Sequence, residues 1–184
     1  MNEKKITLAS IKRAIIWFLK SYIWIVPLVI IVDQVSKLVV EANLNLNEPV
    51  SIIPGVFSFM LSYNTGMAFS FLDNNRVLLA IISVVASIGI ITYLVLRYKK
   101  LNLYTRICIY IILGGCMGNM IDRIFYPNGV IDFIKTDFID FAIFNVADSC
   151  LTVAIIMLLI KLLVDDIKGS KKKNEATDSN NESK

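Results

Sequence analysis

The chain has 184 residues, of which 56% are hydrophobic, and a formal net charge of +4. Its mean hydropathy of +0.66 is high for a soluble domain, and its apolar residues collect in stretches long enough for a helix to cross a bilayer core of about 30 Å. The sequence contains no histidine, which excludes Ser-His and Cys-His nucleophile pairs and most zinc sites. Its three cysteines lie in apolar stretches without CxxC spacing, as expected of small buried residues.

Four apolar stretches predict an all-α membrane protein with four transmembrane helices, at about 22–40, 77–96, 103–121 and 144–164. The first stretch follows several cations and resembles a signal peptide, but no small-x-small cleavage site comes after it, so we expect a retained span. Residues 1–167 are expected to form a single domain. The polar residues 168–184 predict a disordered cytoplasmic tail.

The distribution of cations predicts the orientation of these spans. All but four of the 19 Lys and Arg residues lie before the first span, around the short turn between spans two and three, or at and after the end of span four. By the positive-inside rule, both termini are therefore cytoplasmic, and the long connections near 41–76 and 122–143 face outward. The first connection is rich in β-branched and aromatic residues, which predicts short strands lying on the outer membrane surface.

Polar residues gather at the predicted outward ends of the spans. They occur in five short motifs, in chain order DQVSK, NTGMAFS, GGCMGNMIDR, VIDFI and FNVAD. An ionisable group at the edge of hydrocarbon needs a partner or water to offset its burial, so such residues are candidates for function. The candidates are Asp33, Lys37, Asn64, Asn119, Asp122, Arg123, Asp132, Asn145 and Asp148.

Several of these residues also have a purely structural interpretation. Asp33 and Lys37 are four residues apart and could form only an intrahelical pair. The FNVAD motif resembles a helix N-cap followed by an acid in the first turn, where the helix dipole favours negative charge. Asp122 and Arg123 could form a surface ion pair. The glycines of the GGCMG segment favour close helix packing.

Two aspartates beside one membrane surface, in a chain without histidine, have the chemistry that an acid–base peptidase needs. Two nearby carboxylates cannot both ionise cheaply, so they tend to share one proton. The ionised partner can take a proton from water, while the protonated partner donates to the developing oxyanion or the leaving amine. The sequence alone does not show that Asp132 and Asp148 face each other.

In their order along the chain, these five motifs resemble the lipoprotein signal peptidase family, also called signal peptidase II, from about Ile25 to Leu163. The resemblance implies an aspartic endopeptidase of the bacterial cytoplasmic membrane, with its active site at the extracytoplasmic face. It also implies a small extracytoplasmic β-sheet resting on the membrane surface, which matches the strands expected in the first connection. Such enzymes remove the signal peptide from prolipoproteins, cutting before a cysteine that carries diacylglycerol. The resemblance places the catalytic pair at Asp132 and Asp148, and supporting roles at Asp33, Lys37, Asn64, Asn119, Asp122, Arg123 and Asn145.

The same resemblance implies no metal and no organic cofactor, and diacylglyceryl-prolipoproteins and membrane lipid as partners. We expect no nucleic-acid partner, because the lysines are grouped beside the hydrophobic spans, and we expect a monomer. The chain departs from the family pattern at Met67, Cys116 and Met117, which could alter the shape of the pocket. Two further acids, Asp137 and Asp140, belong to no motif, and we expect them to be solvated. The alternatives are a small proton-coupled transporter or a non-catalytic membrane subunit. The transporter is disfavoured because spans two to four carry no acid near their midpoints.

Overall fold

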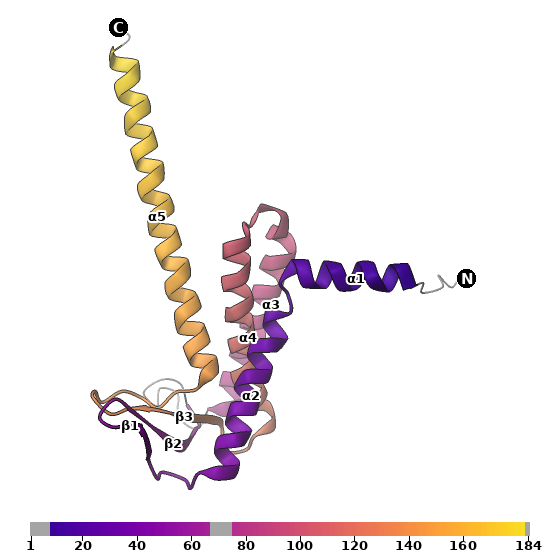
Figure 1. Cartoon of the computed structure of the whole chain (residues 1–184), viewed down its shortest axis with the longest axis vertical. Coiled ribbons are helices and arrows are strands. Elements are labelled where there is room, and N and C mark those ends of the chain that lie inside the picture. Colours follow the sequence, from indigo (N-terminus) through magenta and orange to yellow (C-terminus); the bar gives the residue numbers. More distant parts are fainter. Residues whose placement is uncertain (1–7, 67–74, 183–184) are drawn as a thin grey trace.

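The computed structural model describes residues 8–66 and 75–182, and Figure 1 shows its arrangement. The elements are α1 (Leu8–Ser21), α2 (Ile25–Asn43), β1 (Val50–Ile53), β2 (Phe57–Asn64), α3 (Arg76–Arg97), the 3₁₀ helix η2 (Tyr98–Lys100), α4 (Leu103–Phe125), β3 (Val130–Thr136) and α5 (Val146–Glu182). Helices α2, α3 and α4 stand together, α5 rises from the sheet end, and α1 projects sideways from the opposite end (Figure 1).

Three stretches of the described chain are long and apolar enough to cross a membrane, namely Arg76–Lys100, Leu103–Phe125 and Val146–Ser170. They coincide with the second, third and fourth spans predicted from the sequence. Helix α2 coincides with the first predicted span, but it carries Asp33, Lys37 and Glu41 and is not among these three. A fourth span at α2 therefore stays a prediction.

Helix α4 lies at the centre of the bundle, because α2, α3 and α5 all pack against it. Three glycines on α4 permit these contacts. A methyl group at Gly114 would lie 2.7 Å from Cβ of Val29 on α2, and one at Gly115 would lie 2.8 Å from the carbonyl oxygen of Ala147 on α5. At such distances only glycine fits, so the close packing predicted from the GGCMG segment is confirmed.

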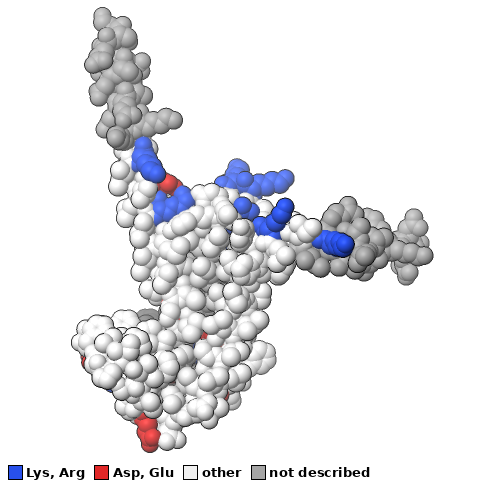
Figure 2. Space-filling model, viewed as in Figure 1, with Lys and Arg blue, Asp and Glu red and all other residues white. Residues whose placement is uncertain are grey.

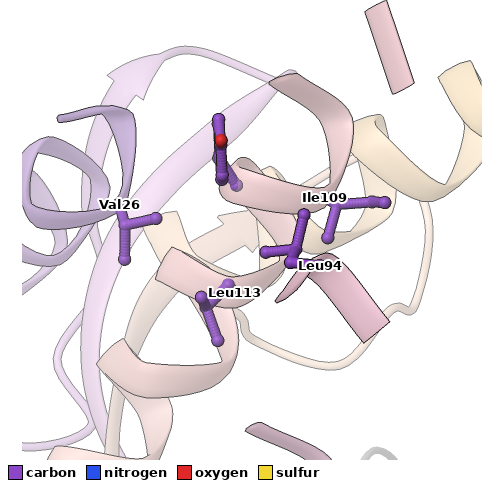
Figure 3. Close-up of a cluster of buried hydrophobic side chains, with 5 residues drawn as sticks. Val26, Leu94, Ile109 and Leu113 are labelled. Carbon is purple, nitrogen blue, oxygen red and sulfur yellow. The ribbon is translucent and has the colours of Figure 1, made fainter. Parts of the chain in front are cut away.

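An apolar cluster joins the helices in the half of the bundle away from the sheet. Val26 of α2, Leu94 of α3, and Ile109 and Leu113 of α4 converge there with Tyr110 (Figure 3). The outward faces of α3 and α5 are also apolar; for example, Leu96 is 74% exposed. A helix that is apolar on its outward faces as well as its inward face is typical of a membrane span.

The three strands form one antiparallel sheet in the order β1-β2-β3. The strands predicted in the first long connection are thus confirmed, whereas β3 in the second connection was not predicted. Buried Leu61 of β2 and Ile131 and Phe133 of β3 pack with Val40 near the end of α2. This second cluster attaches the sheet to the helical bundle.

Helix α5 continues beyond its membrane-spanning part to Glu182, and the disorder expected of residues 168–184 stays a prediction. Extending a helix that has already formed costs little per residue, and Lys, Glu and Ala in this segment are favourable helix formers. Low apolar content argues against a packed core, but it does not prevent the continuation of a helix from a stable span.

Positive charge is concentrated at the end of the bundle opposite the sheet. Figure 2 shows Lys and Arg gathered around the point where α1 leaves, while the middle of this face carries almost no charge. Arg97, Lys99 and Lys100 lie here, at the turn between α3 and α4. The structure therefore separates the sheet from most of the cations, and which end faces the cytoplasm remains a prediction of the positive-inside rule.

The packing predicts opposite effects for two glycine substitutions. Gly118→Ala should lower the stability by about 1–3 kcal/mol, because the new methyl group would lie 2.6 Å from Oδ2 of the buried Asp33. Gly89→Ala on α3 is the matched control, since its methyl group would meet nothing within 4 Å and should be neutral or stabilising. Thermal unfolding of the purified protein in detergent measures both. A Gly118→Ala variant as stable as the wild type would contradict this account of the packing.

Candidate active site

The polar residues predicted from separate motifs form one connected hydrogen-bond network at the sheet end of the bundle. They come from α2, α4, the start of α5, and strands β2 and β3. The network contains Asp33, Lys37, Asn64, Asn119, Asp122, Arg123, Asp132, Asn145 and Asp148. All nine sequence candidates are therefore brought together, although the motifs that carry them lie up to about a hundred residues apart.

Lys37 is the centre of this network. Its side chain is almost fully buried, and its Nζ lies 2.7 Å from Oδ2 of Asp33, 2.8 Å from Oδ2 of Asp122 and 3.0 Å from Oδ1 of Asn119. An ammonium group has three donors, and each has an acceptor here. The intrahelical pair of Asp33 and Lys37 is thus confirmed, but the same lysine also joins α2 to α4.

Asp33 and Asp122 connect Lys37 to the elements that carry the candidate catalytic pair. Oδ1 of Asp33 accepts a hydrogen bond of 2.9 Å from the backbone N–H of Ala147, in the first turn of α5. Oδ2 of Asp122 accepts one of 3.3 Å from the N–H of Ile131 on β3. The surface ion pair considered for Asp122 is wrong, because this residue is fully buried and its cation is Lys37.

The two carboxamides of Asn119 and Asn145 link the candidate catalytic aspartates. Nδ2 of Asn145 lies 2.7 Å from Oδ1 of Asp132 and 3.0 Å from Oδ1 of Asn119. Nδ2 of Asn119 then donates a hydrogen bond of 2.7 Å to Oδ1 of Asp148. A continuous path of amide groups therefore runs from Asp132 on β3 to Asp148 on α5.

Asp148 also takes part in the N-terminal cap of α5. Oδ1 of Asn145 accepts a hydrogen bond of 2.9 Å from the N–H of Asp148, and Oδ2 of Asp148 is 3.3 Å from the N–H of Asn145. This reciprocal arrangement is a capping box. The N-cap interpretation is confirmed, but it uses only one carboxylate oxygen of Asp148 and leaves the other directed at Asn119.

Asp132 lies on β3 in a strongly desolvated position and is 3% exposed. Burial, with a further contribution from the negative charge of Asp148, raises the pKa of Asp132 from 3.8 to about 7. Hydrogen bonds from Asn64 and Asn145 and the charge of Lys37 oppose this rise. Asp132 can therefore exchange a proton near neutral pH.

Asp132 and Asp148 line the same cavity, which has a volume of about 420 Å³. Its other polar lining residues are Asn64, Asn119, Arg123, Ser149 and Thr152. The other walls are largely apolar and come from the segment 141–144 and from α5 side chains such as Leu151 and Val153. The cavity thus places two carboxylates and a guanidinium against an apolar surface.

Sequence reasoning missed two parts of the site. Gln34, inside the DQVSK motif, donates hydrogen bonds to Oδ1 of Asp122 at 2.8 Å and to Oδ2 of Asp33 at 3.2 Å. Its position next to Asp33 was the available signal. The segment 141–144 lines the cavity, but its apolar residues carry no motif that marks them as part of a site.

The residues that depart from the family pattern, and the extra acids, lie away from the cavity where the structure describes them. Cys116 is half-buried, Met117 packs against the apolar cluster, and Met67 is outside the described residues. Asp140 is exposed, and Asp137 accepts a hydrogen bond of 2.6 Å from Oγ of Ser58. None of the four described residues lines the cavity.

The fold and the site together define a helical membrane protein in which a strand and a helix N-terminus bring two aspartates into one partly apolar cavity. Such an arrangement is typical of a site for acid–base chemistry close to a membrane surface. Comparison with known proteins identifies the particular family.

The sequence pattern of the family described as signal peptidase (SPase) II matches residues 25–164. The lipoprotein signal peptidase of Streptococcus thermophilus is 43% identical over 130 residues, which cover 71% of this chain and 84% of that protein. The lipoprotein signal peptidase of Pseudomonas aeruginosa is 39% identical over 162 residues, covering 84% and 92%. A bacterial membrane enzyme structure solved by the in meso method has a TM-score of 0.73 and 31% identity, covering 81% of this chain and 91% of that one.

The chain therefore belongs to the signal peptidase II family. It is a membrane-spanning peptidase that acts in lipoprotein processing, as the resemblance of its motifs implied. A second in meso structure of a bacterial membrane enzyme, with a TM-score of 0.70 and 31% identity over 79% of this chain, shares the same fold.

The raised pKa of Asp132 predicts a pH dependence of stability. The folded protein holds the proton of Asp132 more tightly than the unfolded chain, whose carboxyl has a pKa of 3.8, so the free energy of unfolding falls as the pH rises toward about 7. Asp132→Asn should remove this contribution, worth up to about 4 kcal/mol between about pH 4 and pH 7. Unfolding in detergent across this range measures it, and Asp140→Asn controls for the change in net charge. Identical slopes in the wild type and Asp132→Asn would refute the buried-acid account.

Proposed function

We propose that this member of the family is an aspartic endopeptidase that cuts diacylglyceryl-modified prolipoproteins immediately before the lipid-bearing cysteine. The observation that carries the proposal is that Asp132 and Asp148 line one cavity and are joined through Asn145 and Asn119. Within the part of the chain that the structure describes, no other acid lines that cavity. Two carboxylates that share a proton supply both the base and the acid for peptide hydrolysis.

The environments of the two carboxylates favour different roles. With a pKa raised to about 7, Asp132 holds the shared proton near neutral pH. Asp148 lies in the first turn of α5, where it accepts a hydrogen bond from the N–H of Asn145, and we assign it the role of the base. In this mechanism Asp148 takes a proton from water, the resulting nucleophile attacks the scissile carbonyl, and Asp132 donates its proton to the carbonyl oxygen. Asp132 and Asp148 then reverse roles to protonate the leaving amine.

The remaining network residues position this pair and do not act on the peptide bond. Asn145 and Asn119 orient one oxygen of each catalytic carboxylate. Lys37 holds Asp33 and Asp122, which in turn hold the first turn of α5 and strand β3. Because each aspartate of the pair lies on one of these two elements, the network sets the spacing between them.

The shape of the cavity fits a lipid-bearing substrate. Apolar side chains of the segment 141–144 and of α5 line one side, next to the carboxylates and Arg123. A substrate whose signal peptide is already a helix in the bilayer would enter from the side and place its acyl chains along this wall. Since every group of the site belongs to one chain, a monomer is sufficient for activity.

Helix α2 has the properties of a fourth span, which would place the site at the outward ends of four helices. Its 19 residues correspond to about 28 Å of helix, close to the thickness of the hydrocarbon core. Asp33 and Lys37 are buried against α4 and paired with each other, which offsets the cost of their charges in a membrane. The exposed face of α2 is apolar and includes Leu28, Ile31 and Leu38. By the distribution of cations, the site then faces away from the cytoplasm.

The mechanism predicts that Asp132→Asn and Asp148→Asn each abolish detectable cleavage. General acid–base groups contribute about 10²–10⁴ in rate each, and asparagine keeps the size of the side chain but cannot exchange the proton. The measurement is cleavage of a diacylated prolipoprotein by the purified variants in detergent, together with the amount of each variant in the membrane.

Asp137→Asn and Asp140→Asn are the matched controls, because they make the same chemical change outside the cavity, and both should stay within a few-fold of wild type. Asparagine at position 148 can still accept a hydrogen bond from the N–H of Asn145, so the helix cap should survive this substitution. Near-normal cleavage by Asp148→Asn would leave the cap as the only role of that residue.

The proposed substrate form leads to a separate prediction. The same precursor without diacylglycerol should be cleaved much more slowly, because it cannot occupy the apolar wall of the cavity. The comparison uses one purified enzyme and one precursor sequence, with and without the lipid. Equal rates would exclude lipid recognition, while leaving the assignment of the catalytic pair to the aspartate variants.

A further inference from the structure

Helix α1 leaves the bundle through a well-defined corner. It lies across the direction of α2 at the end opposite the sheet (Figure 1). Tyr22 has a left-handed φ of 60°, Oγ of Ser21 donates a hydrogen bond of 2.8 Å to the carbonyl oxygen of Phe18, and Nε1 of Trp24 donates one of 3.3 Å to that of Leu19. Side chains of the corner therefore satisfy the last carbonyl groups of α1, which holds the change of direction in place.

The last turns of α1 expose large apolar side chains. Ile16, Trp17, Phe18 and Leu19 are consecutive and between 41% and 60% exposed. In the sequence, apolar residues at positions 8, 11, 15 and 18 recur at the spacing of one helical face. Phe18 and Leu19 continue this face, whereas Ile16 and Trp17 project from other sides of the last turns. Exposed apolar side chains in this number mark a surface that something apolar covers.

The charges of α1 identify what covers it. The helix contains Lys12, Arg13 and Lys20 and no acid, and Lys12 and Lys20 are exposed. Arg97, Lys99 and Lys100 lie at the turn between α3 and α4, at the same end of the bundle as α1 (Figure 1). An amphipathic helix with a basic polar face and Trp and Phe among its apolar residues has the composition of helices that lie in the interface of an anionic membrane.

We propose that α1 is an interfacial helix that inserts its apolar residues among the lipids of the cytoplasmic leaflet and binds anionic headgroups through its lysines. The choice of leaflet rests on the orientation in the proposed function, whereas lipid binding by α1 does not. From Ile25 to Lys37, α2 rises about 18 Å, so α1 at one interface places the Lys37 network in the opposite half of a core of about 30 Å. The helix thus fixes the depth of the site in the membrane.

The two tryptophans of the chain, Trp17 and Trp24, make this proposal directly testable. In the full-length Trp24→Phe variant, Trp17 is the only tryptophan. The variant is reconstituted into vesicles of phosphatidylcholine alone, or of phosphatidylcholine with an equal amount of phosphatidylglycerol. Quenching by acrylamide reports contact with water, and quenching by brominated acyl chains reports contact with lipid. Because Trp24→Phe removes a hydrogen bond of the corner, the difference between wild type and Trp17→Phe provides the same signal independently.

In the anionic vesicles, brominated lipid should quench Trp17, and acrylamide should quench it about threefold less than a free tryptophan amide. Omitting phosphatidylglycerol, adding salt, or combining Lys12→Gln with Lys20→Gln should increase the acrylamide quenching. Combining Lys161→Gln with Lys168→Gln, an equal loss of two positive charges on α5, should leave it unchanged.

Two results would overturn the proposal. Full access of acrylamide to Trp17 in anionic vesicles would show that α1 lies in water. Protection from both quenchers would show that α1 packs against protein, such as a second copy of the chain. Neither result depends on cleavage or on orientation, because both leaflets of the vesicle have the same composition, so failure here is distinct from failure of the proposed function.

Discussion

The rest of the structure depends on the three contacts that the buried ammonium group of Lys37 makes. A buried charge is costly unless it is fully paired, and Lys37 has three acceptors, contributed by Asp33, Asp122 and Asn119. Removing the lysine would leave two buried carboxylates without a cation, a loss of about 3–5 kcal/mol for a pair of this kind. The two acids would then also hold the backbone N–H groups of α5 and β3 less firmly.

This network explains how two elements of different kinds present their aspartates to one cavity. Asp132 comes from a strand and Asp148 from a helix N-terminus. The amides of Asn145 and Asn119 bridge them, and Asn145 belongs at once to the helix cap and to the site. A structural role and a functional role thus coexist in the FNVAD motif. Burial at this position disfavours the charged form of Asp132 and so raises its pKa. Carboxylates with shifted pKa values of this kind are typical of functional sites.

In the proposed arrangement, in which α2 is a fourth span, both ends of α2 relate the site to the membrane. At one end, the charges of α2 face α4 and are neutralised within the protein, so its outer face can remain apolar. At the other end, the corner at Tyr22 turns α1 out of the bundle. If α1 lies in the interface, the distance between the corner and Lys37 becomes a fixed depth for the catalytic chemistry. A peptidase whose substrate arrives within the bilayer depends on such a depth, because the scissile bond must meet the carboxylates at its own level.

Local patterns in the sequence determined much of this architecture. Apolar stretches of sufficient length predicted α3, α4 and the membrane part of α5, and β-branched and aromatic residues predicted β1 and β2. The Asn145–Asp148 cap, the Asp33–Lys37 pair and the close packing at the α4 glycines were also predictable, because each depends on residues a few positions apart. The continuation of α5 to Glu182 was not predictable, because composition describes the lack of a core but not the extension of a helix that has already formed.

Only the tertiary structure decided how the motifs combine. Lys37 and Asn119 are 82 residues apart, and Gln34 and Asp122 are 88 apart, so no periodicity or short motif relates them. The pairing of β3 with β2, the choice of Lys37 over Arg123 as the partner of Asp122, and the apolar wall at 141–144 were likewise not predictable. Each is a contact between distant segments that forms only when the helices pack. The sequence by itself thus determined which groups could do the chemistry, and folding determined which of them meet, because burial and hydrogen-bond partners are properties of the packed chain.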